Sequence, residues 1–271
     1  MACTVKVVAD STAAHKIRIV SLQLRYWRAI HAEFMTHRVF SRNASSSRAI
    51  PVKKVLAQVW SDPAGPVHWG ANQAGMQANA ELIGWRNKAA KFLWKMAGRT
   101  ACVFAWGFIK IGLHKQVANR ILEPWQYINV LVTSTEWENF FELRAHPDAQ
   151  PEIQELARAI ASAMALSTPK FLSEGDWHMP YITEEEWETN GDAALLKVST
   201  ARSARTSYLT HEGKPSLVAD DIALHDKLVV AEPLHASPTE HQATTHSSYD
   251  WCRNFRGWRQ YRDYLEAGEA V

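Results

Sequence analysis

A polar run of thirteen residues, from Thr36 to Arg48, concentrates groups that bind anions. It holds one histidine, three arginines, four serines and one asparagine, and little that suits a hydrophobic core. Arginine forks bind phosphate through paired hydrogen bonds, while hydroxyl and backbone N–H groups satisfy the remaining phosphate oxygens. A flexible, solvated serine loop would have the same composition. Because the run directly follows an apolar segment, we expect it to be held in place and to bind an anionic ligand.

A second set of polar groups lies between Thr133 and Arg144. If this stretch is helical, Thr135, Asn139 and Arg144 lie near one another along one flank. That flank could present two polar groups and a guanidinium to one ligand. An ordinary amphipathic helix with a cap near Asp148 fits the pattern equally well, so both interpretations remain open.

Two further segments carry polar and aromatic side chains in the last third of the chain. His235 and His241 could ligate a metal, but no third ligand stands at a suitable spacing, so we predict no metal site. The segment 254–262 interleaves arginines with aromatic residues. This pattern suits stacking on bases and holding phosphates, and it is also common on exposed helices.

The composition is that of a folded protein without a strong charge bias. The chain has 271 residues, 46% of them hydrophobic, and a net charge of +2, which is enough to bury a sizeable core. Cys3, Cys102 and Cys252 are far apart, so we expect neither a disulfide framework nor a structural zinc site. Without a signal peptide or an apolar run of transmembrane length, we expect a soluble, cytoplasmic protein of a bacterium or a phage-infected host, with no membrane partner.

Residue patterns predict one α+β domain over 1–271, mostly helical, with a small mixed or antiparallel sheet. β-Branched content predicts strands, and apolar residues at helical spacing predict helices. The predicted strands cover 4–9, 17–23 and 195–198. The predicted helices cover 25–35, 72–97, 107–123, 125–143, 151–166 and 220–229.

Taken together, the polar segments resemble the flavin-dependent thymidylate synthases. The family signature Arg-His-Arg-x-x-Ser-x-Asn-Glu-x-Ser-x-Arg is matched here by His37, Arg38, Ser41, Asn43, Ser46 and Arg48. The family's Asn-containing helix, which ends in Leu-Arg and is followed by Ala-Gln-x-Glu-Ile, is similar to Asn139, Leu143-Arg144 and residues 149–153. Its Ala-Arg-x-Ser-Tyr/Phe and His-x-Ser/Thr-Pro-Phe-Glu-His elements are similar to residues 204–208 and 235–241.

The order of these elements differs from that of the family. There the Ser-Pro-Phe-Glu-His element precedes the Arg-His-Arg loop, whereas here it lies near the C-terminus. Residues 196–241 therefore resemble the family's N-terminal part moved to the end, which predicts a circular permutation. Permutation is tolerated where native termini lie close together at the surface. The resemblance covers most of residues 17–166 and 196–241.

The resemblance implies a homotetramer with active sites shared between subunits, and FAD bound without a dinucleotide fingerprint. NADPH would reduce the flavin, and 5,10-methylenetetrahydrofolate would supply the carbon that is transferred to C5 of a pyrimidine deoxynucleotide monophosphate. The absence of any GxGxxG sequence agrees with this mode of FAD binding. By the same resemblance, the residues that would contact FAD are His37, Arg38, Asn43, Thr133, Thr135, Asn139, Ser207, His235 and Ser237.

The resemblance also implies which residues would bind the nucleotide: Glu33, Ser46, Ser47, Arg48, Arg120, Arg144 and Asp148. The serines and Arg48 would hold the phosphate from a neighbouring subunit, assisted by Arg120, although a one-residue slip makes Asn119 an alternative. Arg144 would be the catalytic residue, pairing with the pyrimidine edge and favouring the N3-deprotonated ring. An arginine can do this because it stays charged at any working pH.

Several signature positions carry different residues in this chain. Thr36 replaces an Arg, Ala44 a Glu, Glu33 a Gln, Thr239 a Phe and Asp148 a His. The new carboxylates add acceptors, which an amino group on the base needs, whereas a carbonyl needs a donor. Cytosine has the amino group and uracil the carbonyl at ring position four, so dCMP is an alternative to the family's dUMP. Water in place of hydride would give a hydroxymethyl product.

A rival hypothesis is a non-catalytic nucleic-acid-binding protein that uses the serine–arginine run and the basic aromatic tail. Such a protein needs an excess of positive charge to compete for phosphates, and a net charge of +2 offers little. We therefore expect a small-molecule substrate and no nucleic-acid partner.

Overall fold

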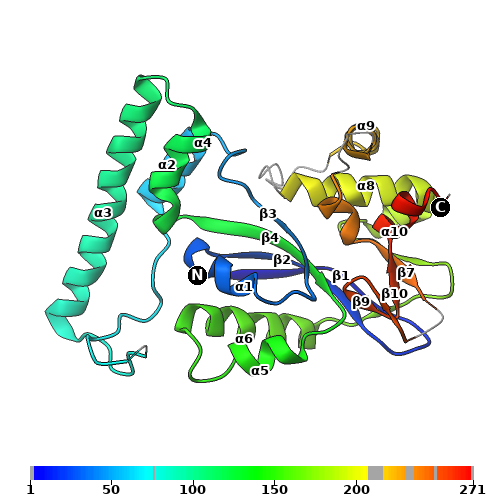
Figure 1. Ribbon diagram of the computed structural model, residues 1–271, viewed down its shortest axis with the longest axis horizontal. Coiled ribbons are helices and arrows are strands. Elements are labelled where there is room, and N and C mark those ends of the chain that lie inside the picture. The colour runs from blue at the N-terminus through cyan, green and yellow to red at the C-terminus, as the bar shows by residue number, and fades with distance from the viewer. Residues whose placement is uncertain (1–2, 76, 207–215, 230–234, 247–248, 270–271) are drawn as a thin grey trace.

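The computed structural model describes residues 3–75, 77–206, 216–229, 235–246 and 249–269. They form an α+β fold in which helices pack on both sides of a five-stranded sheet (Figure 1). The strands are β1 (Thr4–Thr12), β2 (Ile19–Trp27), β3 (Ser41–Ala44), β4 (Tyr127–Ser134), β5 (Lys170–Phe171), β6 (Trp177–His178), β7 (Ala243–Thr245), β8 (Trp251–Cys252), β9 (Phe255–Arg256) and β10 (Trp258–Gln260). The helices are α1 (His31–Phe34), α2 (Val52–Ser61), α3 (Gly84–Lys110), α4 (Lys115–Ala118), α5 (Glu138–Arg144), α6 (Pro151–Leu166), α7 (Glu184–Thr189), α8 (Asp192–Arg205), α9 (Val218–Val229) and α10 (Tyr261–Ala267).

The central sheet depends on the antiparallel pairing of β2 with β4. Their register runs from Val20 opposite Ser134 to Trp27 opposite Tyr127. Both strands are rich in β-branched and aromatic residues, which fit a pleated, buried surface. The strand order is β3-β4-β2-β1-β5, and every neighbouring pair is antiparallel except β1 with β5.

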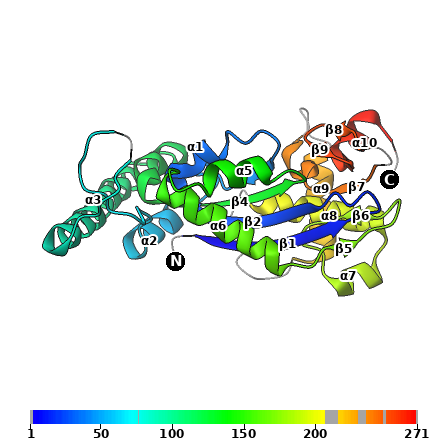
Figure 2. The ribbon, with the colours of Figure 1, turned by 90° about the horizontal axis from the view of Figure 1, so that it is seen from below.

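Helix α6 covers one face of this sheet (Figure 2). It begins with Pro151 in the first turn, where a missing N–H costs nothing, and buries Ile153, Leu156, Ala157 and Ile160 on one stripe. These side chains meet Leu22, Leu24 and Val130 of the strands, together with an aromatic group from α1 and α5. This packing places the end of α5 beside the turn that follows α1.

Helices α2 and α3 form a second body at one end of the sheet (Figure 1). The 27-residue α3 buries only a narrow stripe of small side chains, Gly98, Ala101, Cys102 and Ala105. A Cβ atom on Gly98 would lie 3.0 Å from the Trp125 ring, a tight contact that the ring would have to relieve by a small shift. Trp94 packs against Trp27 and Trp125, whereas Phe92, Leu93 and Phe104 are more than half exposed.

The last third of the chain packs on the other side of the sheet through α8, most of which is buried. Asn43 of β3 donates a hydrogen bond to the Ser203 carbonyl of α8 (2.6 Å). Arg202 of α8 forms ion pairs with Glu186 (2.6 Å) and with the fully buried Asp221 of α9 (3.0 Å). Because a buried charge is stable only when it is paired, these contacts fix α7, α8 and α9 together.

A line of buried hydrogen bonds joins the sheet to the C-terminal elements. Ser11 of β1 bonds His178 Nδ1 (2.9 Å), and His178 Nε2 bonds Ser21 of β2 (2.9 Å). The Ser21 hydroxyl bonds Thr133 of β4 (2.6 Å), whose Oγ1 bonds His241 Nδ1 (2.9 Å). Burial lowers the pKa of both His178 and His241 to about 3, so both rings are neutral near pH 7. We call these five side chains the core polar chain.

Sequence patterns located several elements correctly. The α+β class, the strand at 4–9, the helix at 151–166 and the helix at 220–229 are confirmed by β1, α6 and α9. The strand predicted at 17–23 is β2, but it continues to Trp27 because residues 25–27 pair with β4. The helix predicted at 25–35 is therefore right only in part: residues 25–27 belong to the strand, and a 3-10 turn (Arg28–Ile30) leads into the short α1.

Four other predictions were wrong in whole or in part. The predicted helix 125–143 divides into strand β4 and helix α5, since β4 is enclosed between β2 and β3. Of the predicted helix 72–97, residues 84–97 lie in α3, which ends before Gly112, a residue in the left-handed conformation (φ +82°). The predicted helix 107–123 is divided there into the end of α3, the short α4 and a 3-10 segment (Asn119–Trp125). The strand predicted at 195–198 lies inside α8, where acidic and basic residues occupy the favourable helix ends.

Of the helices in the described ranges, none combines the length and apolar character needed to span a lipid bilayer.

The core polar chain predicts a loss of stability in mild acid. Free histidine titrates near pH 6.5, whereas the folded rings of His178 and His241 resist protonation down to about pH 3. The unfolded state therefore binds more protons between these values, so the free energy of unfolding falls as pH drops below 6.5. The fall should approach roughly 1 kcal/mol per pH unit for each ring. Urea unfolding at pH 7.5, 6.5, 5.8 and 5.2 measures it.

The variant His178→Gln should show a shallower dependence on pH than the wild type over the same range. The exposed His146 on the surface provides the matched control, His146→Gln, which should keep the wild-type slope. An unchanged slope in His178→Gln would contradict the assignment.

Candidate active site

Arg144, the last residue of α5, is held by three side chains from the region of α1. Its Nη1 donates to Glu33 Oε1 (2.5 Å), its Nε donates to His37 Nε2 (3.0 Å) and its Nη2 donates to Thr36 Oγ1 (3.2 Å). The guanidinium is thereby fixed at both ends of its plane. We call Glu33, Thr36, His37 and Arg144 the arginine cluster.

His37 is neutral in this cluster. Burial, with the positive charges of Arg144 and Arg42, lowers the pKa of His37 to about 4. Its Nε2 accepts the hydrogen bond from Arg144, so its own proton resides on Nδ1. A neutral ring lets two cationic side chains lie close by without a third positive charge.

Glu33 has capacity for a further hydrogen bond. Its Oε1 pairs with Arg144, whereas its Oε2 is shielded from solvent and has no hydrogen-bond partner among the described residues. An unpaired buried acceptor is costly, so such a group indicates a place where a ligand donor would be stabilising.

A cleft of about 410 Å³ opens beside the arginine cluster. It lies between the segment 36–40 and α5, and Trp251 of β8 also lines it. Exposed Arg38 and Asn139 provide donors, Leu143 and Trp251 provide exposed apolar surface beside the buried Phe40 and Phe140, and Glu136 and Glu138 provide acceptors. The volume is within the range of small-molecule sites, about 300–1,000 Å³.

This donor set fits the FAD that the sequence predicts. A dinucleotide needs cations and N–H groups for its phosphates, acceptors for its ribose hydroxyls and apolar faces for its rings. All three kinds of group line the cleft. Among the predicted FAD contacts, His37, Arg38 and Asn139 lie together there.

The other predicted FAD residues lie outside the cleft lining. Thr133 is fully buried in the core polar chain, and Asn43 donates to the Ser203 carbonyl. Thr135 accepts a hydrogen bond from the Arg256 backbone N–H (3.1 Å). His235 and Ser237 are exposed near a 3-10 turn at Ser237–Glu240. Ser207 lies outside the described residues.

The residues predicted to hold phosphate form a separate group at the start of α2, on the other side of the sheet from α5 (Figure 1). Arg48 and Arg120 are exposed, and the Ser47 hydroxyl donates to Glu123 (2.8 Å). Asn119 is fully buried and donates to the backbone carbonyls of Ser47 (2.6 Å) and Ile50 (2.9 Å). Of the two alternatives Asn119 and Arg120, it is therefore Arg120 whose side chain is available to a ligand.

Asp148 is exposed and lies near His146 (3.7 Å between Oδ2 and Nδ1), without a hydrogen bond to the arginine cluster. Over the described part of the chain, no three histidine, cysteine or acidic side chains come together in a way that could hold a metal ion.

Sequence patterns did not point to Glu136, Glu138 or Trp251 as cleft residues. Glu136 and Glu138 lie close to Asn139 in the segment 133–144. Only the geometry of the cleft distinguishes these two acids from ordinary surface residues. Trp251 lies just before segment 254–262, in which arginines alternate with aromatic residues. The position of Trp251 on the cleft depends on long-range contacts, which this pattern does not predict.

Comparison with known proteins identifies a family profile that matches most of the sheet and its helices. The profile described as Thy1, thymidylate synthase complementing protein, matches residues 16–170. None of the curated proteins matches the chain.

Several solved structures are similar in part. The UMP/dUMP methylase PolB from Streptomyces cacaoi bound with 5-Br dUMP has 16% sequence identity and a TM-score of 0.48, over 60% of this chain and 90% of that one. The flavin-dependent thymidylate synthase ThyX from Helicobacter pylori complexed with FAD and dUMP has 16% identity and a TM-score of 0.39, over 54% of this chain and 67% of that one.

The buried amide of Asn119 predicts a specific loss of stability. Replacing Asn119 with Ala leaves two backbone carbonyls without their donor, which should lower the free energy of unfolding by about 1–3 kcal/mol. Urea unfolding compares this variant with Gln116→Ala, a change at an exposed position of α4 that should be nearly neutral. Equal unfolding midpoints for the two variants would contradict the role given to Asn119.

Proposed function

Because this chain belongs to the family of thymidylate synthase complementing proteins, we propose that it is a flavin-dependent enzyme that alkylates C5 of a pyrimidine deoxynucleotide monophosphate. The observation that carries the proposal is the arginine cluster beside a cleft whose donors and aromatic faces fit FAD. The comparison structures, whose names refer to UMP, dUMP and FAD, agree with this class of substrate and cofactor.

The proposed reaction balances with the co-substrates that the family resemblance implies. With dUMP, one methylene carbon comes from 5,10-methylenetetrahydrofolate and one hydride from NADPH, and with one proton the products are dTMP, tetrahydrofolate and NADP⁺. FAD, when bound, would carry the hydride from NADPH to the substrate. The residues described here bind, orient and stabilise charge around that transfer.

Arg144 is the residue proposed to act on the base. Alkylation at C5 requires electron density to move from the ring nitrogens and oxygens toward that carbon. A guanidinium on the pyrimidine edge stabilises the N3-deprotonated ring, which is the electron-rich form. The neutral His37 and the Glu33 carboxylate fix the plane of Arg144 in advance, so little reorganisation is needed when substrate binds.

The proposed FAD site combines the cleft with residues near its edges. Arg38 and Asn139 would hold phosphate and polar ring atoms directly. We keep Thr135, His235 and Ser237 as proposed contacts, whereas the buried Thr133 and Asn43 would act mainly by fixing the strands behind the cleft.

The choice of base is the finer part of the proposal. Glu33 Oε2 is an acceptor without a partner among the described residues, and cytosine offers an amino group at position four. The deoxynucleotide dUMP remains the family's substrate. Turnover settles the choice: product from dUMP but none from dCMP would exclude cytosine. A hydroxymethyl product, formed when water replaces the hydride, would appear in the same assay by mass.

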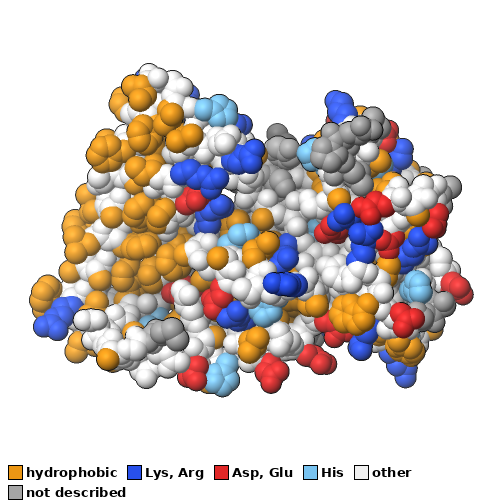
Figure 3. Space-filling view, in the orientation of Figure 1, with side chains coloured by type: hydrophobic (Ala, Val, Ile, Leu, Met, Phe, Trp, Pro, Cys, Tyr) orange, Lys and Arg blue, Asp and Glu red, His pale blue; other side chains and the backbone are white. Residues whose placement is uncertain are grey.

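A second copy of the chain is proposed to complete the site. Arg48 directly precedes α2 and Arg120 lies between α4 and β4, whereas Arg144 is the last residue of α5. Figure 1 shows α2 and α4 on the other side of the sheet from α5, so we infer that one chain does not bring phosphate and base contacts together. Large apolar side chains gather over α3 (Figure 3), among them Phe92, Leu93 and Phe104, each more than half exposed. An apolar area of this kind on an isolated chain marks an interface.

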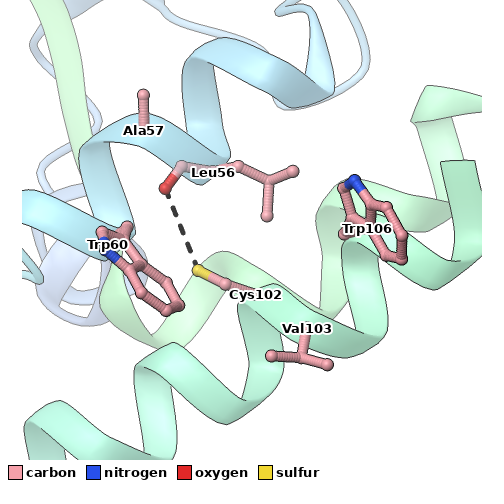
Figure 4. Close-up of a pocket in the computed structure, with 6 residues that line it drawn as sticks. All are labelled: Leu56, Ala57, Trp60, Cys102, Val103 and Trp106. Carbon is pink, nitrogen blue, oxygen red and sulfur yellow. Dashed lines mark hydrogen bonds between the residues drawn. The ribbon is translucent and has the colours of Figure 1, made fainter.

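A groove in the same surface has the shape of a subunit contact. It lies between α2 and α3, has a volume of about 370 Å³ and is lined by apolar side chains, with Trp60 and Trp106 on its edges (Figure 4). We propose that this surface joins subunits in a homotetramer with shared active sites.

Circular permutation is also part of the proposal. Ala243, just after the 235–241 segment, packs in the same buried cluster as Ile17 and Ile19 at the start of β2. An unpermuted relative could therefore pass directly from the first segment to the strand. An experimental structure in which residues 196–241 do not overlap a relative's N-terminal segment would overturn this.

The first prediction concerns FAD and Arg144. The purified protein should take up FAD and show a flavin absorption spectrum that bleaches with NADPH. Arg144→Lys should retain FAD and lose roughly 100-fold or more in turnover, because lysine keeps the charge but not the planar fork. The exposed Arg158 of α6 gives the control Arg158→Lys, which should stay fully active. A colourless protein that ignores FAD and binds single-stranded DNA would favour the nucleic-acid-binding hypothesis instead.

The second prediction concerns the shared site. Arg144→Ala and Arg48→Ala should each be nearly inactive alone. Co-expressed with different tags and purified together, they should regain about a quarter of wild-type turnover, because a quarter of the sites then combine two intact halves. A mixed assembly that remains as inactive as its parents would show that each site is built within one chain.

A further inference from the structure

The C-terminal hairpin of β8 and β9 brings Trp251 to the mouth of the cleft. Trp251 lines the cleft together with Arg38 and Asn139, although more than 200 residues separate it from Arg38 in the chain. Its side chain is 52% exposed, whereas Phe255 on the paired strand is fully buried. The hairpin thus buries one aromatic ring in the protein and leaves the other on the cleft.

The hairpin is tied to both walls of the cleft. Asn254 donates to Ser41 Oγ (3.0 Å) and to the Val39 carbonyl (3.4 Å), next to Arg38 on the first wall. On the second wall, Arg256 donates its backbone N–H to Thr135 and pairs through its side chain with Glu136 (2.8 Å). These contacts hold the hairpin that carries Trp251 in place on the cleft before any ligand arrives.

The groups around Trp251 indicate what would cover it. The cleft is not an apolar groove, because Arg38, Asn139 and two carboxylates line it. A ligand that satisfies these groups carries phosphate and hydroxyl groups, and one that also covers an indole face carries a planar ring. Stacking of such a ring on tryptophan contributes substantially to affinity and does not depend on the identity of the base.

We propose that Trp251 is a stacking platform for a planar heteroaromatic ring of the dinucleotide bound in the cleft. This rests on the proposed function, since FAD is the ligand to which it is assigned. FAD has two such rings, the flavin and the adenine, and they share the chemistry that an indole recognises. The hairpin thereby adds to the site a binding surface that lies outside the segment matched by the family profile.

The test is FAD binding to the full chain and to three variants. Trp251→Ala should bind FAD about 10-fold more weakly than the wild type, and Trp251→Phe should recover most of the affinity because it retains an aromatic face. Phe171, a 61% exposed aromatic residue of β5, provides the control Phe171→Ala, which should bind FAD normally. Titration followed by flavin fluorescence measures all four dissociation constants.

Two further ligands identify the ring. If the flavin stacks on Trp251, FMN affinity should fall in Trp251→Ala and the bound flavin should fluoresce more brightly, because the quenching indole is gone. If the adenine stacks, ADP affinity should fall and FMN affinity should not. Either result supports the platform.

Three other results would contradict the stacking platform. They also distinguish its failure from a failure of the proposed function. Wild-type protein that binds FAD, with Trp251→Ala binding FAD, FMN and ADP equally well, would refute the platform alone. A changed mass of the assembly in Trp251→Ala, measured by light scattering, would assign the indole to a subunit contact instead. Wild-type protein that does not bind FAD would refute both proposals.

Discussion

Five buried side chains are joined in a line by hydrogen bonds, and burial makes each of these bonds costly to lose. Ser11, Ser21 and Thr133 come from three adjacent strands, and His178 and His241 come from the part of the chain that follows α6. Leaving any one of these groups without a partner costs about 1–3 kcal/mol, so the C-terminal elements can dock on the sheet in only one register. The order of the strands and the position of the last third of the chain follow from this constraint.

The same constraint reaches the candidate site through the central strands. With β4 locked between β2 and β3, α5 begins a few residues beyond β4 and ends at Arg144 beside His37. Charge is then balanced locally: one carboxylate, one neutral imidazole and one guanidinium lie within hydrogen-bonding distance. A fixed guanidinium with a neutral neighbour is suited to stabilising negative charge on a ligand, which a solvated arginine does poorly.

Sequence patterns predicted correctly those elements whose bounds depend on residues close together in the sequence. Helix α6 has a proline start and a regular apolar stripe, so its bounds were predicted correctly. The segment from Tyr127 to Arg144 reads as one helix by spacing, yet its first half is a strand, because pairing with β2 and β3 outweighs local preference. Prediction of the candidate site is limited in the same way, because local patterns do not show contacts between residues distant in sequence. The signature brought His37, Arg38, Asn139 and Arg144 together correctly, but Trp251 and the separation of Arg48 from Arg144 depend on contacts distant in sequence. The FAD and nucleotide roles of these residues stay predictions.

The docking of α8 and residues 235–245 against strands made much earlier has a consequence for biosynthesis. The ribosome completes β1 to β4 and α6 well before it releases the residues that cover the opposite side of the sheet. Until then Thr133 has not met His241 and Asn43 has not met the Ser203 carbonyl of α8. The nascent sheet therefore exposes polar groups that the finished fold buries. Contacts of such long sequence separation form late and slowly. The emerging chain is therefore most exposed to misassociation during the last third of its synthesis.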